Sequence, residues 1–179
     1  MERCMQLQQA LELVREIPDF PQSGVLFKDI TPLLANPEAF TIVTSALAGN
    51  PESYSHVVGV EARGFILGAA IAQFAERGFV PFRKAGKLPH TTISKSYGLE
   101  YGVDVIEAHI DALDPSNRIL LIDDVLATGG TLLAAIDLVR EFGATISEVV
   151  VLYEISVLKG RERILEKYPD INLRSIVTG

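Results

Sequence analysis

The chain has 179 residues, of which 48% are hydrophobic and 22% charged, and its formal net charge is −7 at pH 7. These values are typical of one globular domain with a single core, and they exclude a fibrous or disordered chain. The acidic balance argues against a broad nucleic-acid-binding surface, which needs a basic patch.

The N-terminal segment predicts a helix followed by a rigid turn. Apolar side chains between Leu7 and Ile17 recur on one helical face, which predicts a helix over residues 6–17. Pro18 is expected to end this helix, and the sequence Pro-Asp-Phe-Pro at 18–21 is expected to form the turn.

The chain beyond this turn alternates short apolar runs with helical patterns. This alternation indicates a mainly parallel sheet covered by helices on both faces, so we expect an α/β fold. Ligands of such sheets bind at the carboxyl ends of the strands, here the loops after Val60 and Ile122. In chain order the predicted elements are strand 57–60, helix 65–77, strand 79–82, strand 118–122, helix 130–142, strand 148–153 and helix 159–167.

Residues 84–102 have weak periodicity and several glycines and polar residues. A stretch of roughly 19 residues without a clear element is long for a compact domain, and such stretches are often lids or binding loops. The alternative is a plain surface hairpin in which residues 91–97 pair with residues 103–109.

No sequence feature indicates a membrane span, a disulfide or a metal cluster. The most apolar region, 57–74, is interrupted by Glu61 and Arg63 and falls short of the roughly 18 apolar residues that a span needs. Cys4 is the only cysteine, and the residues around it do not form a signal peptide. We therefore expect a cytoplasmic protein with no membrane or nucleic-acid partner.

The strongest chemical signal lies in residues 119–131, where an apolar strand leads into Asp123 and Asp124 and then into a glycine-rich turn and a helix. Backbone N–H groups at a helix N-terminus bind phosphate, and glycines allow the backbone to approach it closely. The two carboxylates can accept hydrogen bonds from vicinal sugar hydroxyls. Together these features predict a ribose 5-phosphate site. Its turn consists of Ala127, Thr128, Gly129, Gly130 and Thr131.

Other interpretations of this segment are weaker. A capped helix after a buried strand, with two solvated acids, would need no ligand. A Walker A loop requires a lysine in the turn, and the dinucleotide fingerprint Gly-x-Gly-x-x-Gly occurs nowhere in the chain.

The stretch 122–131 resembles the phosphoribosyl pyrophosphate (PRPP) binding motif of type I phosphoribosyltransferases. Further segments resemble the adenine-specific branch of this family, in order and at compatible spacing. They are Pro18-Asp19-Phe20-Pro21, Gly24-Val25-Leu26-Phe27-Lys28-Asp29-Ile30-Thr31-Pro32, Glu61-Ala62-Arg63-Gly64-Phe65, Arg83-Lys84-Ala85-Gly86-Lys87-Leu88-Pro89 and Tyr97-Gly98-Leu99-Glu100-Tyr101-Gly102.

This resemblance implies the type I phosphoribosyltransferase fold in one domain, 1–179. Residues 1–35 would form an N-terminal helix and a base-recognition hood, and residues 84–102 a mobile catalytic lid. The implied reaction joins adenine to the ribose phosphate of PRPP and gives AMP and pyrophosphate. Mg²⁺ is implied as cofactor, held mainly by PRPP and water, and a homodimer is implied as the assembly. The alternatives are transfer to another base and a non-catalytic, PRPP-binding regulator.

The resemblance also implies roles for individual residues. Glu100 is the implied general acid/base acting on the purine, although by sequence alone it would be an exposed turn residue. The alternative to pyrophosphate binding is that Arg63 forms a surface ion pair and that residues 83–87 form a solvated charged loop. The residues implied to bind pyrophosphate are Arg63, Arg83, Lys84, Lys87 and Tyr101. Those implied to bind adenine are Val25, Leu26, Phe27 and Lys28.

Overall fold

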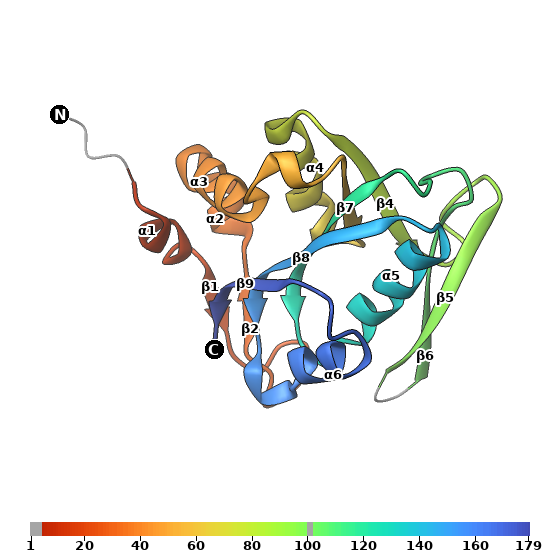
Figure 1. The fold of residues 1–179 in the computed structure, drawn as a ribbon. Coiled ribbons are helices and arrows are strands. Elements are labelled where there is room, and N and C mark those ends of the chain that lie inside the picture. The colour runs from red at the N-terminus through yellow and green to blue at the C-terminus, as the bar shows by residue number, and fades with distance from the viewer. Residues whose placement is uncertain (1–4, 100–101) are drawn as a thin grey trace. The chain divides into compact units, whose positions relative to one another are not determined.

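The computed structural model describes residues 5–99 and 102–179, which form two compact units (Figure 1). The smaller unit ends at Gly49, and the larger begins at Asn50. In the described part of the chain, no helix is both long enough and apolar enough to cross a membrane.

The larger unit is built on one sheet of seven strands in the order β5-β6-β4-β3-β7-β8-β9. The pairs from β4 through β9 are parallel, whereas β6 pairs antiparallel with both β4 and β5. This confirms the predicted α/β fold with a mainly parallel sheet. The strands are β3 (His56–Val60), β4 (Gly78–Lys84), β5 (Thr92–Leu99), β6 (Gly102–His109), β7 (Arg118–Leu126), β8 (Thr145–Glu154) and β9 (Leu173–Thr178).

Helices cover this sheet and bury its central strands. Val57 and Val58 of β3 are fully buried, as are the residues from Ile119 to Ile122 of β7, so neither face of these strands meets water. Such burial explains why their sequences are continuous β-branched and aliphatic runs rather than alternating ones. The helices of this unit are η1 (Pro51–Ser53), α4 (Arg63–Ala75), α5 (Gly130–Glu141), η2 (Ser156–Leu158) and α6 (Gly160–Lys167).

Two strands differ from the prediction in ways that bear on the site. The strand predicted at 118–122 continues to Leu126, so Asp123 and Asp124 lie inside β7 and not in the loop after it. The segment 84–102 contains the regular strand β5, which pairs with β6 from Thr92 opposite His109 to Leu99 opposite Gly102. The hairpin considered as the alternative is therefore present, and in Figure 1 it stands at one edge of the sheet beside α5.

The smaller unit contains a two-stranded sheet and three helices. The predicted helix over 6–17 is wrong after Leu11, because Arg15–Ile17 forms a strand that pairs antiparallel with Phe27–Asp29. This pairing gives the segment backbone hydrogen bonds and two cross-strand ion pairs, Arg15 with Asp29 at 3.6 Å and Lys28 with Glu16, which a continued helix would lose. The elements are α1 (Leu7–Leu11), β1 (Arg15–Ile17), β2 (Phe27–Asp29), α2 (Thr31–Ala35) and α3 (Pro37–Ala48).

The predicted turn at 18–21 is confirmed. The Phe20–Pro21 peptide bond is cis, and Asp19 has a left-handed backbone with φ of 56°. The Asp19 carboxylate accepts a hydrogen bond of 2.7 Å from the backbone N–H of Gly24, which closes the loop between β1 and β2.

Candidate active site

The carboxyl ends of β3 and β7 lie side by side, because the two strands are parallel neighbours with Val58 opposite Leu121. The loop after β3 leads into α4, and the loop after β7 leads into α5. This arrangement brings the loops at residues 61–62 and 127–129 to one edge of the sheet, where ligands of such folds bind.

Residues 127–131, predicted to bind phosphate and called the phosphate loop from here on, comprise the turn between β7 and α5 and the first two residues of α5. Gly129 precedes the first residue of α5 with a left-handed φ of 80°, a conformation that favours glycine. The loop lines a small pocket together with Asp123. The 12-residue helix α5 begins here, so its N-terminal N–H groups and the positive end of its dipole favour a bound anion.

Asp123 and Asp124 are both buried, with exposed fractions of 9% and 6%. The backbone N–H of Asp124 donates to the Asp123 carboxylate at 2.9 Å. Burial raises the pKa of both carboxyl groups, and at Asp124 the guanidinium of Arg63 opposes this effect. The predicted role of the two acids in holding a sugar diol stays a prediction, and the structure places both acids within a strand rather than in a loop.

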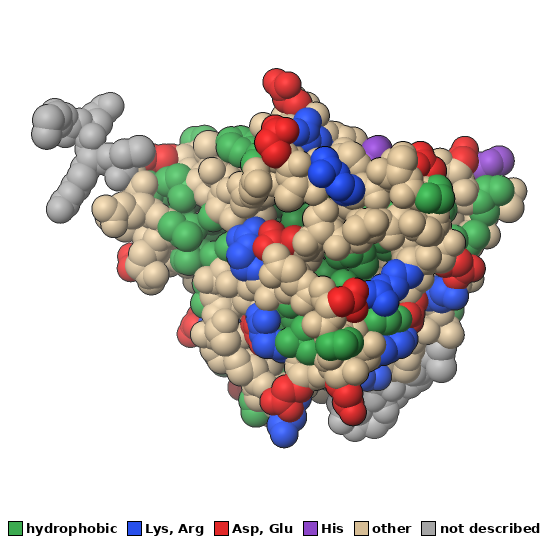
Figure 2. Space-filling view, viewed as in Figure 1, with side chains coloured by type: hydrophobic (Ala, Val, Ile, Leu, Met, Phe, Trp, Pro, Cys, Tyr) green, Lys and Arg blue, Asp and Glu red, His purple; other side chains and the backbone are tan. Residues whose placement is uncertain are grey.

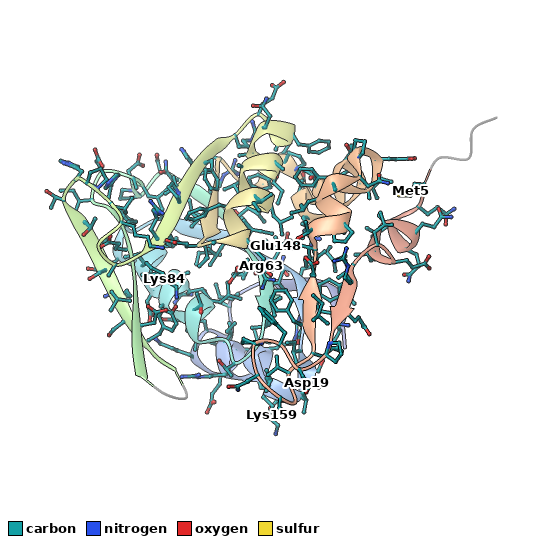
Figure 3. All side chains as sticks on the ribbon, turned by 180° about the vertical axis from the view of Figure 1, so that it is seen from behind. Met5, Asp19, Arg63, Lys84, Glu148 and Lys159 are labelled. Atoms are coloured by element: carbon teal, nitrogen blue, oxygen red, sulfur yellow. The ribbon has the colours of Figure 1, made fainter. Side chains whose placement is uncertain are left out.

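Arg63 begins α4 and connects it to β7. Its Nε atom lies 2.7 Å from an Asp124 carboxylate oxygen, which makes a close ion pair between α4 and β7. Glycine at position 64 lets the start of α4 lie close to β7, because a Cβ there would be only 3.0 Å from the carbonyl oxygen of Ile122. Figure 3 labels Arg63 near the centre of the view and Lys84 to its left, towards β5 and β6.

The Glu61 side chain contacts two of the cations predicted to bind pyrophosphate, Arg83 and Lys87. This side chain, which is 9% exposed, contacts Lys87 Nζ and lies 3.4 Å from Arg83 Nε. It also accepts a hydrogen bond of 2.9 Å from the backbone N–H of Lys84. Burial alone would raise the pKa of Glu61, but the hydrogen bonds from Lys87 and Lys84 outweigh it and lower the pKa. The Glu61–Ala62 peptide bond is cis.

Lys84 belongs to a second cluster on the hairpin. Its Nζ atom lies 2.9 Å from an Asp104 carboxylate oxygen, and the hydroxyl of Tyr97 donates to the same oxygen at 3.0 Å. The hydrogen bond with Lys84 lowers the pKa of Asp104 and raises that of Lys84. Tyr97 also packs beside the phosphate loop, since a Cβ on Gly130 would lie 3.4 Å from its ring.

The turn that carries Lys87 is held by Glu107, a buried acid of β6 that is 7% exposed. One carboxylate oxygen accepts from the backbone N–H groups of Gly86 at 3.0 Å and Lys87 at 3.2 Å, and the other accepts from the Thr92 hydroxyl at 3.3 Å. Sequence reasoning missed the side chains of Glu61 and Glu107. An acid beside the predicted Arg63 was a usable signal for Glu61, whereas no local pattern marks Glu107.

The larger unit thus brings together the predicted phosphate, ribose and pyrophosphate residues. The predicted adenine residues lie in the smaller unit: Phe27 packs edge-on against Phe20 with ring centroids 5.1 Å apart, Lys28 pairs with Glu16, and Leu26 is half-exposed. The backbone N–H of Val25 donates to the carbonyl oxygen of Gln22 at 3.2 Å.

The predicted residues Glu100 and Tyr101 lie outside the described residues. Within the part described, no group of three or more His, Cys, Asp or Glu side chains could hold a metal ion.

Comparison with known proteins decides the family. A model of the phosphoribosyl transferase domain matches residues 30–178. The adenine phosphoribosyltransferase of Streptomyces clavuligerus is 54% identical over 156 residues, which cover 86% of this chain and 88% of the relative. The chain belongs to the adenine phosphoribosyltransferase family. A second family member, from Thermobifida fusca, is 52% identical over 168 residues, 92% of this chain and 93% of the relative.

Solved adenine phosphoribosyltransferases have the same fold. The enzyme from Rhodothermus marinus superposes with a TM-score of 0.89 at 43% identity, covering 97% of this chain and 98% of that one. The Giardia lamblia enzyme, solved in complex with 9-deazaadenine, superposes with a TM-score of 0.90 at 41% identity over 98% of both chains.

Proposed function

We propose that this adenine phosphoribosyltransferase transfers the 5-phosphoribosyl group of PRPP to N9 of adenine, giving AMP and pyrophosphate. The observation that carries this proposal is the phosphate loop at the start of α5, directly after two buried acids. In this assignment residues 127–131 bind the 5-phosphate through backbone N–H groups and threonine hydroxyls, and Asp123 and Asp124 accept hydrogen bonds from the ribose hydroxyls.

In this reaction the protein positions the two substrates and stabilises charge, and it forms no covalent bond with either of them. The bond between C1′ and the pyrophosphate oxygen breaks towards an oxocarbenium-like ribose, and its electron pair leaves with pyrophosphate. N9 of adenine attacks C1′ from the opposite face and loses its proton. Arg63, Arg83, Lys84 and Lys87 stabilise the departing anion, because lysine and arginine close to a developing charge lower the barrier.

Mg²⁺ is the proposed cofactor. The site fits it, because Asp123 lines the pocket in which the phosphates of PRPP would lie and its carboxylate offers an oxygen ligand there. When bound, mainly by PRPP oxygens and water, Mg²⁺ would neutralise charge on the pyrophosphate.

We assign base recognition to residues 25–28. Phe27 would stack on the purine, and backbone groups near Leu26 would read its exocyclic amine. A backbone carbonyl accepts a hydrogen bond from that amine and rejects a 6-oxo base, which offers no donor there. The Giardia lamblia relative, solved in complex with 9-deazaadenine, supports a purine as the base.

The remaining roles rest on family membership. Glu100 acts on the purine as general acid/base, and Tyr101 beside it helps to hold PRPP. Residues 84–102 close over the site as a lid and exclude water, which would otherwise hydrolyse PRPP. The enzyme is cytoplasmic and works as a homodimer in this proposal.

A regulator that binds PRPP and contacts nucleic acid is the alternative from another class. Such a protein needs a continuous basic face. On the face seen in Figure 2, lysine and arginine side chains lie among aspartate and glutamate side chains, and the net charge is −7. Both observations favour the enzyme.

A panel of bases tests the function. The protein with Mg²⁺ and PRPP is mixed separately with adenine, hypoxanthine, guanine and orotate, and nucleotide formation is followed by chromatography. We expect a product with adenine alone. A product with a 6-oxo base would overturn the assignment of residues 25–28, and PRPP binding without any product would favour the regulator.

A further inference from the structure

Gly160, the first residue of α6, packs its backbone directly against the phosphate loop. A Cβ on Gly160 would overlap the carbonyl oxygen of Ala127 and lie 2.6 Å from Leu126 Cδ1 and 3.0 Å from Gly129 N. In the opposite direction, a Cβ on Gly129 would lie 2.9 Å from the carbonyl oxygen of Gly160. Neither residue has room for a side chain, so the two backbones fit each other only as glycines.

The start of α6 is itself anchored to the sheet. Arg161 donates from Nε and from its NH2 group to the buried Glu154 carboxylate, at 2.9 Å and 2.6 Å. It also donates to the carbonyl oxygen of Leu173 at 2.8 Å and to the Ser175 hydroxyl at 2.9 Å. The residue after Gly160 therefore connects β8 with β9, and Gly160 presents a fixed surface to the loop.

A second contact fixes the next peptide of the loop. The exposed side chain of Arg163, one turn along α6, donates to the carbonyl oxygen of Thr128 at 3.4 Å. The carbonyl oxygen of Ala127 thus faces the backbone of Gly160, and that of Thr128 faces the Arg163 side chain. In a trans peptide the following N–H points opposite to the carbonyl, so the N–H groups of Thr128 and Gly129 point away from these two contacts.

We infer that Gly160 and Arg163 are positioning residues for the phosphate loop: they hold its carbonyl groups and so orient its N–H groups for the 5-phosphate of PRPP. The inference rests on the proposed function, and neither residue belongs to the 122–131 motif. Sequence reasoning missed them because they lie about 30 residues beyond the loop that they support.

Gly160→Ala is the first test. We expect the KM for PRPP and its dissociation constant, measured by calorimetry, to rise about tenfold, with kcat changed less, because the loop is displaced before any chemistry. Gly143→Ala is the matched control. Gly143 has a φ of 75° and a Cβ there would lie 3.2 Å from Pro115, but it lies beyond the far end of α5. Both variants should melt at lower temperature, and only Gly160→Ala should bind PRPP more weakly.

Arg163→Ala is the second test, and it still tests whether α6 positions the phosphate loop if Gly160→Ala does not fold. Losing one hydrogen bond should raise the PRPP dissociation constant about threefold. Its control is Arg118→Ala, because exposed Arg118 makes the same kind of bond, at 3.2 Å to the carbonyl oxygen of Glu52, at the opposite end of β7.

Unchanged PRPP affinity in Arg163→Ala and in folded Gly160→Ala, or equal losses in the two controls, would overturn the inference. A wild-type protein that binds PRPP but makes no nucleotide would refute the proposed function alone, because the calorimetric comparison still decides the roles of Gly160 and Arg163.

Discussion

Asp124→Asn is expected to lower kcat/KM for PRPP about 100-fold, which corresponds to roughly 3 kcal/mol of lost transition-state stabilisation. The buried carboxylate would lose charge-assisted hydrogen bonds to a ribose hydroxyl, each of which contributes about 1.5–3 kcal/mol. The amide would also leave Arg63 without the acid that lies 2.7 Å from its Nε atom. Initial rates at a series of PRPP concentrations measure the effect.

Asp170→Asn is the control for this substitution. Asp170 also pairs with an arginine, Arg140 at 2.6 Å, but its side chain is 69% exposed and belongs to another surface. Its loss should leave kcat/KM within about twofold, because exposed ion pairs contribute little. A value for Asp124→Asn as close to wild type as this control would contradict the assignment of Asp124 to the ribose.

The same acid predicts a pH dependence. Burial raises the pKa of Asp124, so its carboxylate takes up a proton at a higher pH than an ordinary aspartate does. On acidification, PRPP affinity should therefore begin to fall above the usual aspartate pKa of about 3.9. The fall should be smaller in Asp124→Asn, in which Asp123, whose pKa burial also raises, can still take up a proton.

Lys87→Ala is expected to lower kcat about 100-fold, because a cation beside a departing pyrophosphate stabilises charge that develops only in the transition state. Glu61 holds the Lys87 ammonium group among the other cations, and Glu107 holds the backbone of its turn at 3.2 Å. The side chain is thus placed before any anion arrives. Single-turnover rates at saturating PRPP measure the chemical step.

Lys95→Ala provides the comparison. Lys95 lies on β5 and pairs with Glu141 of α5, away from Glu61. The Lys95→Ala substitution should change kcat less than about threefold, because an exposed ion pair contributes little. If Lys87→Ala behaves in the same way, Lys87 does not contact pyrophosphate in the transition state.

The parallel core and the turn before α5 were predictable because their signals are local. A β-branched run such as 57–60 is typical of a strand buried on both faces, and the Thr-Gly-Gly-Thr sequence at 128–131 predicts the start of a helix, which the structure has at Gly130. Their positions in the fold follow from the rule for parallel sheets.

What could not be predicted depends on contacts between distant residues. The apolar spacing from Leu7 to Ile17 fits a helix, yet Arg15–Ile17 pairs with a strand that comes ten residues later. Asp123 and Asp124 resemble loop residues by their polarity, but β7 keeps them buried because Arg63 from another helix lies against Asp124. Pairing partners override local preference in both cases.

Glu61, Glu107 and Gly160 show the same limit within the site. Each acts on a segment at least 19 residues away, Glu61 on Lys84 and Lys87, Glu107 on the turn at 86–88, and Gly160 on the phosphate loop. A single sequence gives the identity of each residue, but it does not show which distant residues are in contact in the folded chain.

A crystal structure with AMP would test the central claim most directly. We predict that the AMP phosphate lies within hydrogen-bonding distance of backbone N–H groups of residues 128–131, with the ribose hydroxyls on Asp123 and Asp124. AMP bound with its phosphate elsewhere, or with its ribose away from both acids, would contradict the account.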